Sequence, residues 1–146
     1  MIKIQNSSLK IILSGLMICT AVGLLQAQQM NITGPAGSGQ FGSFITVLTN
    51  GNYVVTDPYY DEGALTDVGA VYLYNGSTHS LISTLKGSTA NDQVGSSVIV
   101  ALANGNFVVR SPYWHNGTAT NAGAVTWVNG STGLNATISS SNSLVG

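Results

Sequence analysis

The chain has 146 residues, of which 6 % are charged and 44 % are hydrophobic, and its formal net charge is −1. Ordinary soluble domains carry about 25 % charged residues. With four Lys and Arg residues in total, the chain has no basic surface to neutralise a phosphate backbone, so nucleic acid is excluded as a leading partner. Beyond one N-terminal run, Gly, Asn, Ser and Thr interrupt the apolar residues too often for a membrane span.

Residues 1–27 have the pattern of a secretory signal peptide. The start is basic, Ile11–Leu25 is hydrophobic, and Ala27 offers a small residue at the cleavage edge. We expect cleavage after Ala27 and a secreted or cell-surface product with residues 28–33 as its lead-in; a signal retained as an anchor is the alternative. Cys19, the only cysteine, lies in this segment, so the remaining chain has no disulfide and no cysteine metal ligand.

The rest of the chain has the composition of a β protein. Gly, Asn, Ser and Thr dominate it and separate short runs of β-branched and aromatic residues. A helical domain would need Ala, Leu, Glu and Lys in those places. We therefore predict an all-β fold.

The same order of residues occurs twice, in units 34–86 and 87–146. Both contain NGN followed by an aromatic residue and Val-Val, then Pro-Tyr-aromatic, GAV and NGST. The second unit is longer, with extra residues near Ala101 and between Thr132 and Gly146. Its last three residues match the start of a third copy, which predicts a fragment of a longer repeat array.

Each unit contains four strand signals. The first is an almost continuous apolar run, typical of a strand buried on both faces, at Ser43–Leu48 and Val98–Leu102. The other pairs are Tyr53–Thr56 and Phe107–Arg110, Ala70–Tyr74 and Ala124–Val128, and Leu81–Leu85 and Leu134–Ile138.

Asn-Gly pairs mark the turns. Asn50-Gly51 and Asn104-Gly105 predict two-residue type I′ hairpins, in which both central residues have positive φ. A second Asn-Gly turn follows the third strand at Asn75-Gly76 and Asn129-Gly130. Four antiparallel strands make up one blade of a β-propeller, so we predict two four-stranded blade-like units.

Three motifs of the first unit carry a family resemblance. Phe41-Gly42-Ser43, Val54–Pro58 and Gly69–Tyr72 resemble the FG-GAP repeat of integrin-alpha β-propellers. The units are also similar to the tandem repeats of large secreted bacterial surface proteins, including haemagglutinin-like adhesins. The resemblance covers residues 34–146 and implies an incomplete propeller at a bacterial cell surface; it implies no assigned activity.

Integrin-type blades bind calcium through closely spaced carboxylates in a hairpin loop. The corresponding turns here, at Asn50 and Asn104, contain no carboxylate, so we expect no metal and no cofactor. The acidic residues instead gather in the first long loop, where a calcium site is the alternative to a solvated acidic loop. Its candidate ligands are Asp57, Asp61, Glu62 and Asp67.

No pattern predicts catalysis. His79 and His115 occupy non-equivalent repeat positions, and the chain has no G-x-S-x-G nucleophile motif. We therefore predict that the protein is not an enzyme.

Two pairs of loop aromatics are candidate ligand contacts, because exposed rings supply large contact area for proteins and sugars. They are Tyr59 with Tyr60 and Tyr113 with Trp114, and each pair follows a proline. The alternative is that one ring of each pair packs in the repeat core. Trp127 aligns with Leu73 and is predicted to be a core residue.

Taken together, the sequence predicts a secreted or cell-surface β-repeat module with a structural or adhesin-like binding role. Its expected partners are an extracellular protein or glycan, further repeats of a longer chain, or other copies that associate through exposed strand edges. An accessory carbohydrate- or calcium-binding domain of an extracellular enzyme is one alternative function, and an inert spacer is another.

Overall fold

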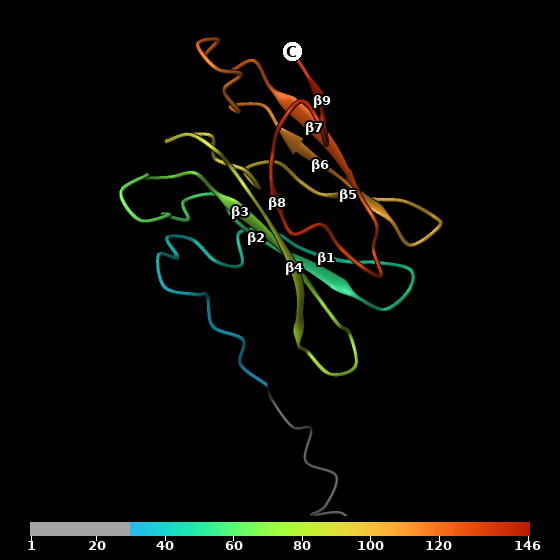
Figure 1. Ribbon diagram of the computed structural model, residues 1–146. Helices are drawn as coiled ribbons and strands as arrows, with labels where there is room; N and C mark the ends of the chain where they lie inside the picture. The colour runs from blue at the N-terminus through green and yellow to red at the C-terminus, as the bar shows by residue number, and fades with distance from the viewer. Residues whose placement is uncertain (1–29) are drawn as a thin grey trace, which may run out of the picture. The chain divides into compact units, whose positions relative to one another are not determined.

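The structure is a computed structural model that describes residues 30–146, so the predicted signal peptide lies outside the described residues. The described part of the chain is built from strands and turns, which confirms the all-β prediction (Figure 1). It contains no helix long and apolar enough to cross a membrane. The strands are β1 (Ile45–Val47), β2 (Tyr53–Asp57), β3 (Ala70–Tyr74), β4 (Leu81–Lys86), β5 (Val100–Ala101), β6 (Phe107–Ser111), β7 (Ala124–Val128), β8 (Ala136–Thr137) and β9 (Leu144–Val145).

These strands form two sheets whose central strand pairs are equivalent. The first sheet has the order β1-β2-β3-β4-β8, and the second has the order β5-β6-β7-β9. In both sheets the central pair is antiparallel over five residues: β2 pairs with β3, and β6 pairs with β7. The two-unit repeat is therefore correct, but the first sheet has five strands where four were predicted.

The central strands form where the sequence predicts them. Both predicted third strands agree with β3 and β7 to the residue, and each second strand is one residue longer than predicted. Their β-branched and aromatic residues fit a pleated, buried surface. Every residue of β3 is buried.

The fourth strand differs between the repeats. Leu81–Lys86 forms β4 beside β3, as predicted. The predicted counterpart, Leu134–Ile138, contains β8, but β8 pairs in parallel with β4 of the first sheet. β9 instead takes the place beside β7, with Leu144 opposite Val125 just as Leu85 lies opposite Val71. The extra residues of the second repeat thus carry the chain to the first sheet and back.

The prediction that the first strand is buried on both faces is wrong. β1 and β5 are short edge strands, and Ile45 and Val47 are 66 % and 70 % exposed. Strand alternation places both side chains on one face of the sheet, and that face is open at the edge.

The predicted type I′ turns are also wrong. In the first hairpin the Gly51 N–H donates to Leu48 O (3.0 Å) and the Leu48 N–H donates to Asn52 O (2.8 Å). Gly51 has a φ of 86°, whereas Asn50 is not among the residues with positive φ. This is a three-residue loop in which only the glycine is left-handed, and the second repeat has the same hydrogen bonds one unit later.

The second Asn-Gly turns use the asparagine side chain. The Oδ1 of Asn75 accepts hydrogen bonds from the N–H groups of Ser77 and Thr78, and Asn129 does the same in the second repeat. The left-handed residues come later in the turn, at His79 and Gly133, and Gly76 is not among them. Asparagine therefore stabilises these turns through its amide oxygen.

The two sheets pack against each other around one hydrophobic core. The side chains of this core are at most 5 % exposed. Burial of each large apolar side chain stabilises the folded state by about 1.5–3 kcal/mol. The core consists of Leu48, Val54, Val71, Leu73 and Leu85 from the first repeat and Val94, Ile99, Phe107, Val109, Trp114, Ala124, Val128 and Ile138 from the second.

Equivalent residues of the two sheets point in the same direction. In β3, Leu73 points into the core, toward the second sheet. The equivalent residue of β7, Trp127, points away from the first sheet and is 54 % exposed, while its neighbour Val128 is buried. The prediction of Trp127 as a core residue is therefore wrong, because the sheets are stacked with the same orientation and not with mirrored faces.

Candidate functional site

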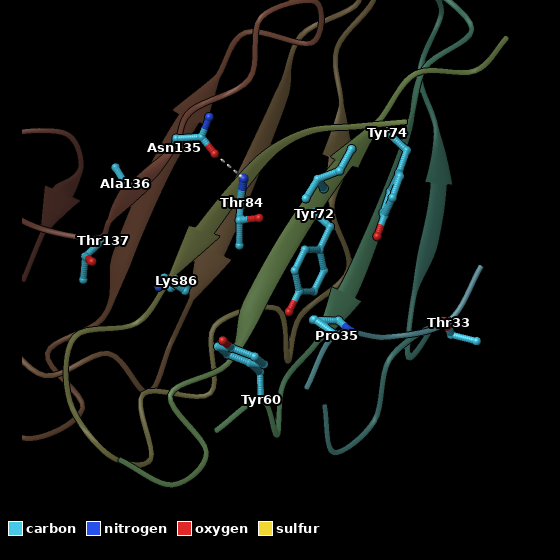
Figure 2. A pocket seen from close by; sticks show the side chains of 11 residues that line it. Thr33, Pro35, Tyr60, Tyr72, Tyr74, Thr84, Lys86, Asn135, Ala136 and Thr137 are labelled. Atoms are coloured by element: carbon cyan, nitrogen blue, oxygen red, sulfur yellow. Dashed lines mark hydrogen bonds between the residues drawn. The ribbon is translucent and has the colours of Figure 1, made fainter. Parts of the chain in front are cut away.

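A cleft of about 570 Å³ lies on the outer face of the first sheet, the face turned away from the core. Its walls come from β3, β4, β8 and the segment that precedes β1, as Figure 2 shows. Across the cleft, the Thr84 N–H donates to Asn135 Oδ1 (2.9 Å), which holds the start of β8 against β4. The lining residues are Thr33, Pro35, Tyr60, Tyr72, Tyr74, Leu81, Thr84, Lys86, Asn135, Ala136 and Thr137.

Aromatic rings cover the floor of this cleft. The Tyr72 ring lies 5.5 Å from the Phe41 ring and 6.4 Å from the Tyr60 ring, measured between centroids. Tyr74 stacks on Tyr53 at 5.4 Å. In Figure 2 the Tyr72 hydroxyl points toward Tyr60 and Pro35, and it has no hydrogen-bond partner among the described residues. Burial, and then the charge of Asp57, raise the pKa of the Tyr72 hydroxyl well above its ordinary value of 10.0.

Tyr72→Phe is expected to keep or raise stability at neutral pH, by up to about 1 kcal/mol, because it removes an unpaired buried hydroxyl. From about pH 10 upward, tyrosine ionises in the unfolded chain while Tyr72 stays protonated in the folded protein, so the free energy of unfolding falls as pH rises. The variant should lose less stability between about pH 9 and pH 11 in urea unfolding. Tyr59→Phe, at a ring that is 43 % exposed, is the control, and an equal effect in both variants would contradict the assignment.

The four acidic candidates do not gather into a metal site. Asp57 is fully buried and accepts hydrogen bonds from Ser38 Oγ and from the Gln40 N–H. Asp61 Oδ1 accepts the Asp67 N–H (2.8 Å), and Glu62 forms an ion pair with Lys86. Within residues 30–146, no three His, Cys, Asp or Glu side chains are placed to share a metal ion.

The loop aromatics divide into one exposed and one packed ring in each pair. Tyr59 and Tyr113 are 43 % and 46 % exposed. Trp114 is 4 % exposed and belongs to the core, and Tyr60 packs edge-on against Tyr72. Trp114 is therefore unavailable as a surface contact, and the exposed candidates are Tyr59 and Tyr113.

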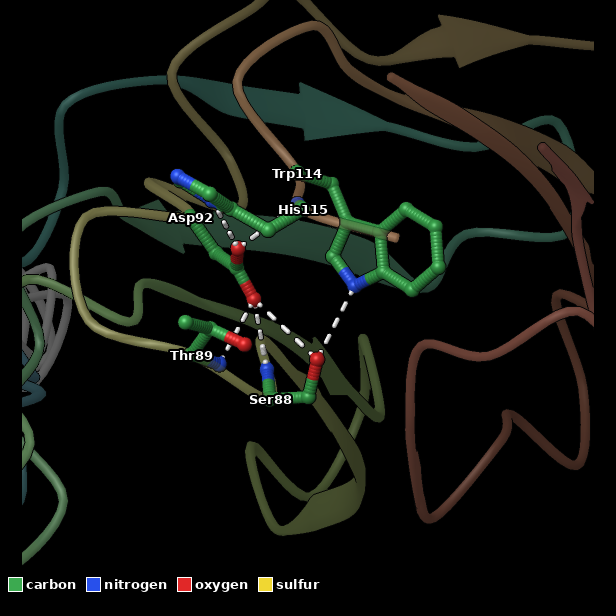
Figure 3. A network of polar contacts seen from close by, with 5 residues as sticks. All are labelled: Ser88, Thr89, Asp92, Trp114 and His115. Atoms are coloured by element: carbon green, nitrogen blue, oxygen red, sulfur yellow. Dashed lines mark hydrogen bonds and ion pairs between the residues drawn. The ribbon is translucent and has the colours of Figure 1, made fainter. Parts of the chain in front are cut away.

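A buried carboxylate in the second repeat is the most connected polar group of the described chain, and the sequence did not point to it. Figure 3 shows Asp92 between the 88–89 segment and the loop that follows β6. Its Oδ2 accepts the Ser88 N–H (2.7 Å), the Thr89 N–H (2.8 Å) and the Ser88 hydroxyl (3.3 Å). Its Oδ1 accepts the His115 N–H (2.9 Å) and contacts His115 Nδ1 (2.8 Å).

This network is built to join two segments. Trp114 Nε1 donates to Ser88 Oγ (3.1 Å), so the same serine links the carboxylate to the core. Ser88 hydrogen-bonds to Asp92 and not to His115, so the order of groups differs from a Ser-His-Asp triad, in which the histidine lies between the other two. The sequence around this network shows only a polar turn followed by a single Asp. The first repeat has Gly39 at the position of Asp92, so the repeat pattern does not point to the network either.

Two stacked sheets with the same internal order of residues define a tandem β-repeat protein. Residues 47–96 and 101–146 each match the family model of a repeat of unknown function (DUF5650), so the chain belongs to this repeat family. The family identified is neither an FG-GAP nor a propeller family. No curated protein and no solved structure matches the chain.

Proposed function

We propose that this protein is a secreted or cell-surface β-repeat module with a structural and adhesin-like binding role and no catalytic activity. The observation that carries the proposal is the pair Tyr59 and Tyr113, which occupy equivalent loops of the two repeats and are about equally exposed. Tyrosine rings offer a large contact area for little loss of side-chain entropy. Two such rings at the repeat spacing suit an extended partner, either a glycan or another extracellular protein.

Three further features support this proposal. The low charge and the signal-like pattern of residues 1–27 are typical of an exported protein. The resemblance to repeats of bacterial surface proteins favours a surface role. The polar cluster around Asp92 serves to join segments, and its geometry lacks the serine-to-histidine contact that a Ser-His-Asp hydrolase needs.

The double variant Tyr59→Ser, Tyr113→Ser is expected to lower binding at least tenfold, because exposed aromatic contacts commonly contribute about 1–2 kcal/mol each. The measurement is binding of the labelled protein to an array of immobilised glycans and to extracellular-matrix proteins. Leu65→Ser, at an apolar side chain that is 42 % exposed in the first long loop, should bind like the unaltered chain. Equal binding of the double variant and the control would contradict the proposal.

Calcium titration by calorimetry separates this function from the calcium-dependent alternative. We expect no binding heat and no change in melting temperature, because three of the four acidic candidates, Asp57, Asp61 and Glu62, already accept N–H groups, a hydroxyl or a lysine. Saturable heat that disappears in Asp61→Asn would favour the calcium-binding alternative. Absence of binding to every glycan and matrix protein would favour the inert spacer.

A further inference from the structure

The outer face of the second sheet is apolar and uncovered. It is formed by Val100, Val108, Val125, Trp127 and Leu144, and we call it the Trp127 face. Val125, Trp127 and Leu144 are 43 %, 54 % and 79 % exposed, and Arg110 is the charged residue beside them. Contiguous apolar surface of this kind marks interaction sites in soluble proteins.

The first repeat shows what kind of surface covers such a face. The residues equivalent to Val125, Trp127 and Leu144 are Val71, Leu73 and Leu85, which lie at the same positions in the strand registers. These three are 2 %, 1 % and 2 % exposed, because the second sheet packs on them. The Trp127 face is thus the second copy of a face that this fold already buries against a repeat sheet.

The complementary surface is also present and is only partly covered: Tyr72 and Tyr74 on it are 3 % and 7 % exposed, whereas Val47 and Leu81 are 70 % and 52 % exposed. The second sheet contacts the first through residues that include Ile99, which is 4 % exposed. By strand register its equivalent in the first repeat is Ile45, which is 66 % exposed. A Cβ at Gly95 would lie 3.0 Å from Thr56 Cβ and 3.3 Å from Val71 Cγ2, whereas a Cβ at the equivalent Gly42 meets nothing within 4 Å.

The cleft of Figure 2 lies on this second surface. Three of its aromatic residues, Tyr60, Tyr72 and Tyr74, are the repeat equivalents of Trp114, Thr126 and Val128. All three of those residues are buried at the contact between the two sheets. The cleft therefore lies where the repeat pattern places the next sheet.

We propose that the Trp127 face binds the outer face of the first sheet of a second copy of this chain, head to tail. The contact between the two copies would have the same geometry as the contact between the two sheets within one chain. In the contact within the chain, the Nδ2 groups of Asn50 and Asn52 both donate to Gly130 O, at 2.9 Å and 2.8 Å. Their equivalents, Asn104 and Asn106, would donate to Gly76 O of the second copy. Each end of such a pair keeps one open face, so longer assemblies form as concentration rises.

The first test is sedimentation velocity of the full chain over a concentration series, combined with acrylamide quenching of tryptophan fluorescence. Trp114 is buried in every state, so the accessible emission comes from Trp127, and its quenching should fall as the chains associate. Trp127→Ser and Ile45→Ser are each expected to weaken association at least tenfold. Leu65→Ser, which lies on neither face, should associate like the unaltered chain; circular dichroism confirms that each variant is folded.

Mixing the two variants tests the head-to-tail arrangement. Trp127→Ser keeps an intact first-sheet face and Ile45→Ser keeps an intact Trp127 face, so the mixture should form dimers and no larger species. Association of Ile45→Ser alone would indicate pairing of two Trp127 faces and overturn the proposal. It would also be overturned by a chain that stays monomeric at its highest soluble concentration, or by association that neither substitution changes.

Discussion

Asp92→Ala is expected to lower the free energy of unfolding by about 3 kcal/mol or more. The carboxylate is fully buried and accepts hydrogen bonds from two segments of the second repeat, so its removal leaves several buried donors without a partner. A loss of this size is a large fraction of the 5–15 kcal/mol that typically holds a domain together. Urea unfolding followed by tryptophan fluorescence measures this loss, because the indole of Trp114 donates to Ser88 in the same network.

Two variants control this prediction. Asp92→Asn keeps one acceptor oxygen and should lose less stability than Asp92→Ala. Glu62→Ala removes a carboxylate from a partly exposed ion pair with Lys86 and should cost no more than about 1 kcal/mol. Similar losses for Asp92→Ala and Glu62→Ala would show that the buried network does not stabilise the fold.

Leu73→Ala is expected to cost about 3–4 kcal/mol, because it leaves a cavity where the first sheet meets the second. Leu73 is 1 % exposed and belongs to the core cluster. The repeat supplies the matched control: Trp127→Ala changes the equivalent position of the second sheet, where the ring is 54 % exposed.

In a dilute solution of monomers, Trp127→Ala should change the free energy of unfolding by less than about 1 kcal/mol, although it removes the larger side chain. The measurement is urea unfolding of both variants at the same low protein concentration. A larger loss for Trp127→Ala than for Leu73→Ala would mean that the sheets do not stack with the same orientation.

The central strands were predictable because their residues are alike in both repeats and have strong β preference. β3 and β7 agree with the prediction to the residue. The edge strands were not, since an apolar run looks the same whether one or both of its faces are covered. Ile45 and Ile99 are the same residue at equivalent positions, yet one is exposed and the other is buried.

The candidate site was only partly predictable, for the same reason. Sequence reasoning identified the two loop pairs, but only packing decided that Tyr59 and Tyr113 are exposed while Trp114 is in the core. The cleft was missed because Asn135–Thr137 reach it from the other repeat, through a parallel pairing with β4 that no local pattern predicts. Asp92 was missed because a single acidic residue in a turn carries no distinctive spacing.

The sequence by itself determined the all-β class, the twofold repeat, the central strands and the places of the turns. These features depend on local preferences and on the recurrence of residues along the chain. Tertiary structure alone decided which sheet β8 joins, which face of each sheet is buried, and that Leu73 and Trp127 have opposite environments. Burial depends on what lies across a face. Two similar units stacked in the same orientation cover one copy of that face and leave the other exposed.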